Sequence, residues 1–129
     1  MAKPLIAVVN DDTIFLELMH DLLTSEGYRT AIWKEGDTAY EMIKEHRPAL
    51  VVLDIRMERP DTGWMVLELM RLDPKTAKIP VIICSADTER IRAKEAYLRD
   101  KGCEILEKPF LLEDLLAKVQ SFIGPPQAD

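Results

Sequence analysis

The chain has few of the residues that mark disulfide scaffolds, zinc proteins or membrane proteins. Its 129 residues include two cysteines, Cys84 in an apolar run and Cys103 beside a turn glycine, and no CxxC motif or Cys/His cluster. This pattern excludes a disulfide framework and a zinc site, so we expect both thiols to be reduced and structural. The apolar run before Asn10 has only five residues. It is too short for a signal-peptide core or a membrane span, so we expect a cytoplasmic protein without membrane insertion.

The chain also lacks an excess or a cluster of positive charge. It carries 17 Lys and Arg against 23 Asp and Glu, a formal net charge of −6, without a basic arm or stripe. Because binding to nucleic-acid phosphates depends on clustered positive charge, we expect no direct contact with nucleic acid. Hydrophobic residues make up 47% of the chain and charged residues 31%. This balance excludes disorder and collagen, and the length fits one domain with one core.

Short apolar or β-branched runs predict the strands. Three of them are apolar at every position: Leu5 to Val9, Leu50 to Leu53 and Val81 to Cys84. Such runs are typical of strands that are buried on both faces of a parallel sheet. Two weaker runs, Arg29 to Trp33 and Glu104 to Glu107, complete a set of five.

Segments with helical periodicity separate these strands. Their apolar stripes fall within residues 14–23, 39–43, 66–70, 88–101 and 112–123. Most end at glycine or proline, which are common helix stop signals, while the segment 88–101 is thin in apolar residues and charged nearly all round. Strict β-α alternation predicts a single-domain, doubly wound α/β fold with five parallel strands and five helices. We expect this domain to span residues 1–124, followed by a short tail at 125–129.

Polar residues follow four of the predicted strands, at the sheet edge where ligands of doubly wound folds gather. They are Asn10-Asp11-Asp12, Asp54, Ser85 and Lys108-Pro109. Three carboxylates, a hydroxyl and an ammonium group are thus expected to converge. Ionised carboxylates repel one another and need a cation, and oxygen ligands with room for water suit Mg²⁺. One carboxylate can then attack a phosphoryl group while Mg²⁺, Lys108 and Ser85 bind its oxygens, which yields an aspartyl phosphate.

Four motifs at these strand ends resemble those of response-regulator receiver domains of two-component signalling. They are Val8-Val9-Asn10-Asp11-Asp12, Val51-Val52-Leu53-Asp54-Ile55-Arg56-Met57, Ile83-Cys84-Ser85-Ala86 and Lys108-Pro109-Phe110. The resemblance covers residues 4 to about 123 and implies the flavodoxin-like strand order 2-1-3-4-5. It also implies that Asp54 accepts phosphate from a histidine kinase or a histidine phosphotransfer protein and that the chain then switches its contacts with a downstream protein target.

The same resemblance assigns the site residues. It implies that Asp12, Asp54 and the backbone carbonyl of Arg56 bind Mg²⁺ directly and that Asp11 assists. Ser85 takes the place of the switch hydroxyl, and Lys108 that of the phosphate-binding lysine, commonly followed by a cis proline, here Pro109. Such a domain is not an enzyme beyond its own phosphotransfer and dephosphorylation.

Three departures from the family pattern stand out. The loop Met57 to Gly63 is one residue longer with a displaced proline, and the stretch from Gly102 to Lys108 is one residue shorter. Ile105 stands where the family commonly has an aromatic ring that turns inward, so we expect the switch to stay in the loop after the fourth strand and in residues 88–101. Arg56 and Asp87 occupy the two positions that tune phosphate lifetime, and their opposite charges can pair.

Other functions compete with a stand-alone phosphorylated switch. A haloacid-dehalogenase-like phosphatase also uses a strand-end aspartate and Mg²⁺, but it needs a second acid where this chain has Arg56, and the chain has no room for a cap domain. A degenerate receiver would bind partners without phosphorylation. A flavodoxin-like cofactor carrier is disfavoured because the acids would repel a flavin phosphate. We expect Trp33 and Trp64 to be packing residues, with Trp64 also able to line the rim of the site.

Overall fold

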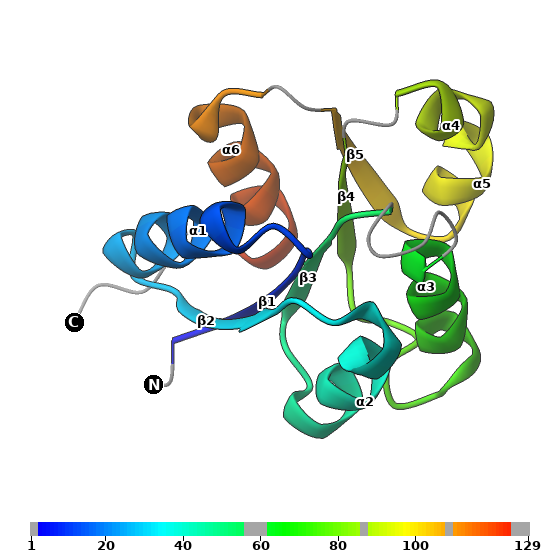
Figure 1. Cartoon of the computed structure of the whole chain (residues 1–129), viewed down its shortest axis with the longest axis horizontal. Helices are drawn as coiled ribbons and strands as arrows, with labels where there is room; N and C mark the ends of the chain where they lie inside the picture. The colour runs from blue at the N-terminus through cyan, green and yellow to red at the C-terminus, as the bar shows by residue number, and fades with distance from the viewer. Residues whose placement is uncertain (1–2, 56–61, 86–87, 108–109, 125–129) are drawn as a thin grey trace.

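The computed structural model describes residues 3–55, 62–85, 88–107 and 110–124. Five strands form one parallel sheet in the order β2-β1-β3-β4-β5 (Figure 1). The strands are β1 (Leu5–Val9), β2 (Arg29–Trp33), β3 (Leu50–Leu53), β4 (Val81–Ser85) and β5 (Cys103–Glu107). The predicted parallel sheet and its strand order are confirmed. Strand β4 ends one residue later, and β5 begins one residue earlier, than the sequence predicts.

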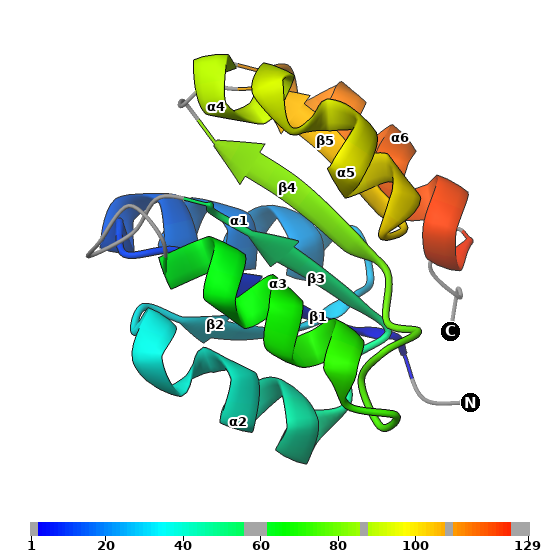
Figure 2. The ribbon, with the colours of Figure 1, turned by 90° about the vertical axis from the view of Figure 1, so that its right-hand side faces the viewer.

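Helices cover both faces of this sheet. The described helices are α1 (Thr13–Ser25), α2 (Gly36–His46), α3 (Thr62–Leu72), α4 (Thr88–Ala93), α5 (Glu95–Asp100) and α6 (Leu112–Ile123). Buried residues of α1 and α6 form one core cluster, and those of α2, α3, α4 and α5 form the other. Figure 2 shows α2, α3 and α5 on the side of the sheet that faces the viewer. None of the helices in the described part of the chain is long and apolar enough to cross a membrane.

The central strands show why their sequences lack alternation. All four residues of β3 are buried, and they divide between the two clusters. Val51 and Leu53 contribute to the cluster under α2 and α3, whereas Leu50 and Val52 contribute to the cluster under α1 and α6. Because successive side chains of a strand point to opposite faces, a strand covered on both sides is apolar throughout. The predicted burial of these strands on both faces is confirmed.

One predicted helix is divided in the structure. Residues 88–101 were expected to form one helix, but α4 and α5 are separated at Lys94, which has φ −114° and ψ 13°. Ile91 and Leu98 are buried, and the six residues between them are exposed. Helices in proteins are stabilised mainly by packing of an apolar face, so this segment has little to hold it straight. The five helices expected from the sequence are therefore six in the described residues.

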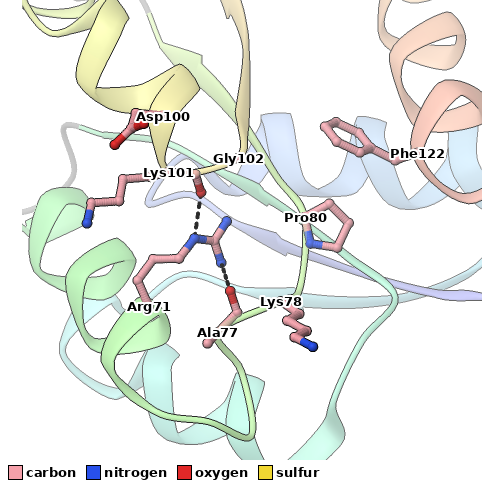
Figure 3. A pocket seen from close by; sticks show the side chains of 8 residues that line it. All are labelled: Arg71, Ala77, Lys78, Pro80, Asp100, Lys101, Gly102 and Phe122. Carbon is pink, nitrogen blue, oxygen red and sulfur yellow. Dashed lines mark hydrogen bonds between the residues drawn. The ribbon is translucent and has the colours of Figure 1, made fainter.

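At the end of the sheet opposite the polar strand ends, the Arg71 side chain donates hydrogen bonds to three backbone carbonyls. Its Nε donates to the carbonyl of Lys101 at 2.7 Å, and its Nη1 donates to the carbonyls of Ala77 at 3.2 Å and Ile79 at 2.8 Å. A hollow of about 570 Å³ lies beside the amino ends of β4 and β5. Figure 3 shows Arg71, Ala77 and Lys101 among the residues that line it. Burial raises the pKa of the nearby Cys103 thiol, an effect that Arg71 opposes. Cys84 and Cys103 are both buried, which fits the structural role expected of them.

A polar contact joins α2 to the turn after α3. The Tyr40 hydroxyl donates to the carboxylate of Asp73, and the Lys44 ammonium lies 3.1 Å from the same carboxylate. The backbone N–H of Lys75 also donates to Asp73, at 2.9 Å. The hydrogen bond from Tyr40, followed by those from Lys75 and Lys44, lowers the pKa of Asp73 to about 2.

Candidate functional site

Strands β1 and β3 bring two acidic segments to one edge of the sheet. The strands are adjacent and parallel, with Val9 paired to Leu53. Directly after this pair, the backbone N–H of Asp54 donates to the carbonyl of Val9 at 3.0 Å. The ladder thus continues one residue beyond β3 and fixes Asp54 beside the start of the Asn10-Asp11-Asp12 segment. The Asp54 residue is buried, with 8% of its surface exposed.

Asp12 forms the N-cap of α1. Its Oδ1 accepts hydrogen bonds from the backbone N–H groups of Ile14 at 3.0 Å and Phe15 at 3.3 Å. Both bonds use the same oxygen, so the cap does not use Oδ2. A capping aspartate satisfies backbone donors that the first helical turn leaves without partners. The cap therefore fixes the position of the carboxylate while its second oxygen is left for another role.

The buried Asn10 orients Asp12, a contribution that the sequence analysis missed. Asn10 is 1% exposed, and its Oδ1 accepts the backbone N–H of Asp12 at 2.9 Å. The backbone N–H of Asn10 donates to the carbonyl of Trp33 at 3.0 Å, which connects the segment to β2 as well. The signal was present in the sequence, because a buried amide after an apolar strand requires partners and Asn commonly bonds to the backbone two residues on.

The three carboxylates differ in exposure. Asp11 and Asp12 are exposed whereas Asp54 is buried. In the part of the chain that the structure describes, no group of three or more His, Cys, Asp and Glu side chains could hold a metal ion. Strands β1 and β3 bring the three acids to one edge of the sheet, and the convergence of their side chains on one metal site stays a prediction. Mg²⁺ usually keeps several waters and takes one or two carboxylates rather than a cage of protein ligands, so the donor set of Asp12 and Asp54 fits this ion.

Apart from Ile105, the structure describes only the backbone of one of the remaining predicted site residues, Ser85, and none of the others. Ser85 is the last residue of β4 and pairs with Glu107 of β5, so its backbone lies at the same edge as Asp54, while its side chain is outside the described part. Arg56, Asp87, Lys108 and Pro109 also lie outside the described residues. Their assigned roles stay predictions.

Ile105 and the two tryptophans all contribute to or pack against one core cluster. Ile105 is 9% exposed, pairs with Ile83 across the sheet and belongs to the core cluster under α3. Trp33 and Trp64 are partly buried and pack against the same cluster, so their predicted packing role is confirmed. The indole N–H of Trp33 donates to the Thr38 hydroxyl at 2.8 Å.

The start of α3 contacts the backbone that carries Asp54. The N–H of Gly63 donates to the carbonyl of Ile55 at 3.0 Å. A Cβ at Gly63 would lie 2.4 Å from the carbonyl oxygens of both Asp54 and Ile55 and 2.5 Å from the Cα of Ile55. Only glycine permits this approach. The start of α3 is thus held directly against the strand end that carries Asp54, while the altered loop predicted from the sequence lies largely outside the described residues.

Comparison with known proteins gives a consistent result. The model of the family described as "response regulator receiver domain" matches residues 6–120. The polar-differentiation response regulator DivK of Brucella anthropi is 28% identical over 120 residues, which cover 92% of this chain and 95% of the relative. The solution structure of the BeF3-activated receiver domain of nitrogen regulatory protein C (NtrC) is 26% identical and superimposes with a TM-score of 0.74 over 95% of this chain and 96% of that chain.

A further solved structure supports the fold. The receiver domain of the sensor histidine kinase PA1611 from Pseudomonas aeruginosa PAO1 has a TM-score of 0.81 at 23% identity, over 95% of this chain and 99% of that chain. That structure has a magnesium ion coordinated in its active site cleft. The family match extends from β1 into α6, across all five strands and the edge that carries Asp12 and Asp54. The chain therefore belongs to the response regulator receiver domain family of two-component signalling.

Proposed function

We propose that this chain accepts a phosphoryl group on Asp54, with Mg²⁺, from a histidine kinase or a histidine phosphotransfer protein. The observation that carries the proposal is the position of Asp54, a buried acidic residue fixed just after β3, at the same sheet edge as Asp12, the N-cap of α1. Burial of a carboxylate at a sheet edge is costly, and ionisable groups in such places are candidates for function. The relatives named as response regulators support the same role.

The proposed reaction is a displacement at phosphorus. A carboxylate oxygen of Asp54 forms a bond to phosphorus, and the bond from phosphorus to the imidazole nitrogen of the donor breaks. The electron pair of that bond stays with the imidazole, which accepts a proton when it leaves. When bound by Asp12, Asp54 and the carbonyl of Arg56, with Asp11 assisting, Mg²⁺ would neutralise the acids and bind phosphoryl oxygens. Lys108 and Ser85 are proposed to bind the same oxygens from the ends of β5 and β4.

Exposed apolar residues beside this edge support a protein as the donor. Ile14 and Leu18 are one turn apart on α1, directly after Asp12, and are 78% and 50% exposed. The ring of Phe15 lies 6.3 Å from that of Phe110 in an edge-to-face contact, which brings the exposed Leu111 near the same helix. Several exposed apolar side chains near one edge are typical of protein contacts.

Labelling with acetyl phosphate tests the proposal. We expect intact-mass spectrometry to show a gain of one phosphoryl group that requires Mg²⁺, disappears in Asp54→Asn and is removed by hydroxylamine, which cleaves acyl phosphates. The matched control is Asp21→Asn, at an exposed acid on α1, which should label as the unaltered chain does. Labelling that persists in Asp54→Asn would contradict the proposal. A chain that never labels would instead support phosphorylation-independent binding.

A further inference from the structure

The first turn of α3 contains two buried polar atoms that have no hydrogen-bond partner. They are the hydroxyl oxygen of Thr62 and the indole nitrogen of Trp64, on either side of Gly63. Among the residues that the structure describes, these are the two buried side-chain polar atoms without a hydrogen-bond partner. Buried polar groups almost always have partners, and an exception calls for a physical explanation. A second conformation in which these atoms gain partners is one such explanation.

This turn contacts the backbone that carries Asp54. Gly63 leaves no room for a side chain between its Cα and the carbonyls of Asp54 and Ile55. Closely packed atoms transmit displacement because there is no void to absorb it. A shift of the strand end after β3 must therefore move the first turn of α3, and with it Trp64.

Trp64 extends from this turn to both α4 and α5. Its ring centroid lies 6.4 Å from that of Tyr97 on α5, and the guanidinium carbon of Arg90 on α4 lies 6.0 Å from the ring. These three residues line a groove of about 240 Å³ together with Glu68 and Lys94. Lys94 is also the point at which α4 and α5 are separated. The indole thus spans the break between the two helices.

Few buried side chains hold helix α4, and the ion pair that joins it to β5, from Arg92 to Glu107 at 3.5 Å, is largely exposed on the Arg92 side. The described α4 side chains, at positions 89–93, include one buried residue, Ile91, and four that are at least partly exposed. Elements with few buried apolar contacts open or move at low cost, and switching elements are drawn from them. A change in the contact between Trp64 and Arg90 therefore acts on a helix that is free to respond.

We propose that Trp64 couples the state of Asp54 to α4 and α5. The inference rests on the proposed phosphorylation of Asp54. The ring at position 64 takes the relay role that Ile105, an aliphatic side chain already buried in the core, does not offer. In the phosphorylated state the first turn of α3 shifts, the indole N–H gains an acceptor, and the contacts of Trp64 with Arg90 and Tyr97 change.

Hydrogen exchange with and without beryllofluoride and Mg²⁺ tests this coupling. In the unaltered chain we expect protection within residues 88–101 to change by roughly fivefold or more, the lower end of ordinary coupling between sites. Trp64→Leu should abolish that change. The matched control is Trp33→Leu, which removes an indole that packs against the same core cluster, and it should retain the change. A change of equal size in Trp64→Leu would overturn the inference.

A second readout does not depend on the folding of Trp64→Leu. In Trp33→Phe the remaining tryptophan is Trp64, and its emission should change when beryllofluoride and Mg²⁺ are added together. An unchanged emission would overturn the inference. Acetyl phosphate labelling of the same samples separates the two proposals. If Asp54 is labelled while emission and exchange do not respond to Trp64, the coupling is wrong and the proposed function stands; if Asp54 is never labelled, both fall.

Discussion

Replacing Gly63 with alanine perturbs the contact between α3 and the backbone that carries Asp54. The added Cβ would lie 2.4 Å from two carbonyl oxygens and 2.5 Å from a Cα, and all three are backbone atoms that cannot rotate away. Overpacking of this kind costs about 1–3 kcal/mol, and loss of the hydrogen bond from Gly63 to Ile55 adds about 0.5–1.5 kcal/mol. Alanine regains about 1 kcal/mol of helix propensity. Together these terms give a net destabilisation of about 0.5–3.5 kcal/mol. We expect the upper half of that range, about 2–3.5 kcal/mol, because only backbone can give way.

Urea unfolding followed by circular dichroism measures this loss, with Gly102→Ala as the comparison. Gly102 has φ +78°, and an added Cβ there would meet only the end of the Arg71 side chain, at 3.8 Å. Its cost is therefore that of left-handed backbone, about 1–2 kcal/mol. Gly63→Ala should also slow acetyl phosphate labelling of Asp54, whereas Gly102→Ala should not. A Gly63→Ala chain as stable as the original, with unchanged labelling, would refute the close contact.

Five further substitutions, at four positions, test other features of the structure. Thr62→Val should stabilise the fold by about 1 kcal/mol, because the buried Thr62 hydroxyl has no partner. Thr76→Val should destabilise the fold by a similar amount, because the Thr76 hydroxyl donates to a carbonyl of α3 at 2.7 Å. Urea unfolding of the two variants would contradict this reasoning if both changes in stability had the same sign. Asp12→Asn should lose Mg²⁺ affinity but keep the cap of α1, whereas Asp12→Ala should lose both. Metal titration measures the lost affinity, and thermal unfolding should show that Asp12→Ala is about 1 kcal/mol less stable than Asp12→Asn. The pKa of Asp73 is lowered to about 2, chiefly by the hydrogen bond from Tyr40, so its stabilising effect is complete above about pH 4 and is lost as the pH falls towards 2. Acid unfolding of Asp73→Asn should be less steep in that window, and an identical acid limb would show that the contact contributes nothing.

The sheet was predictable because its signals are local. Leu50 to Leu53 and Leu5 to Val9 are apolar at every position, which identifies buried parallel strands without any knowledge of the neighbours. The break at Lys94 was not predictable, because it depends on which side chains of residues 88–101 the sheet buries. The strand order came from the resemblance to receiver domains, since the pattern of strands and helices alone does not fix it.

The sequence predicts which strand ends carry the site residues, but not how their side chains are held in place. Asp11 and Asp12 are adjacent in sequence and chemically identical, yet Asp12 is fixed by the cap of α1 and by Asn10, whereas the structure assigns Asp11 no such contact in its described part. The approach of Gly63 to Asp54 joins residues on both sides of a loop, and no local pattern reports such packing. The groove around Trp64 depends on three helices and was equally hidden from the sequence.

Borohydride reduction of the labelled chain tests the central claim, that Asp54 is the phosphoacceptor. The reagent converts an aspartyl phosphate to homoserine, which peptide mass spectrometry locates to one residue. After treatment with acetyl phosphate and Mg²⁺, we expect homoserine in place of Asp54 and unmodified Asp11 and Asp12. Homoserine in place of Asp11 or Asp12, or a phosphoryl group that resists reduction, would contradict the claim.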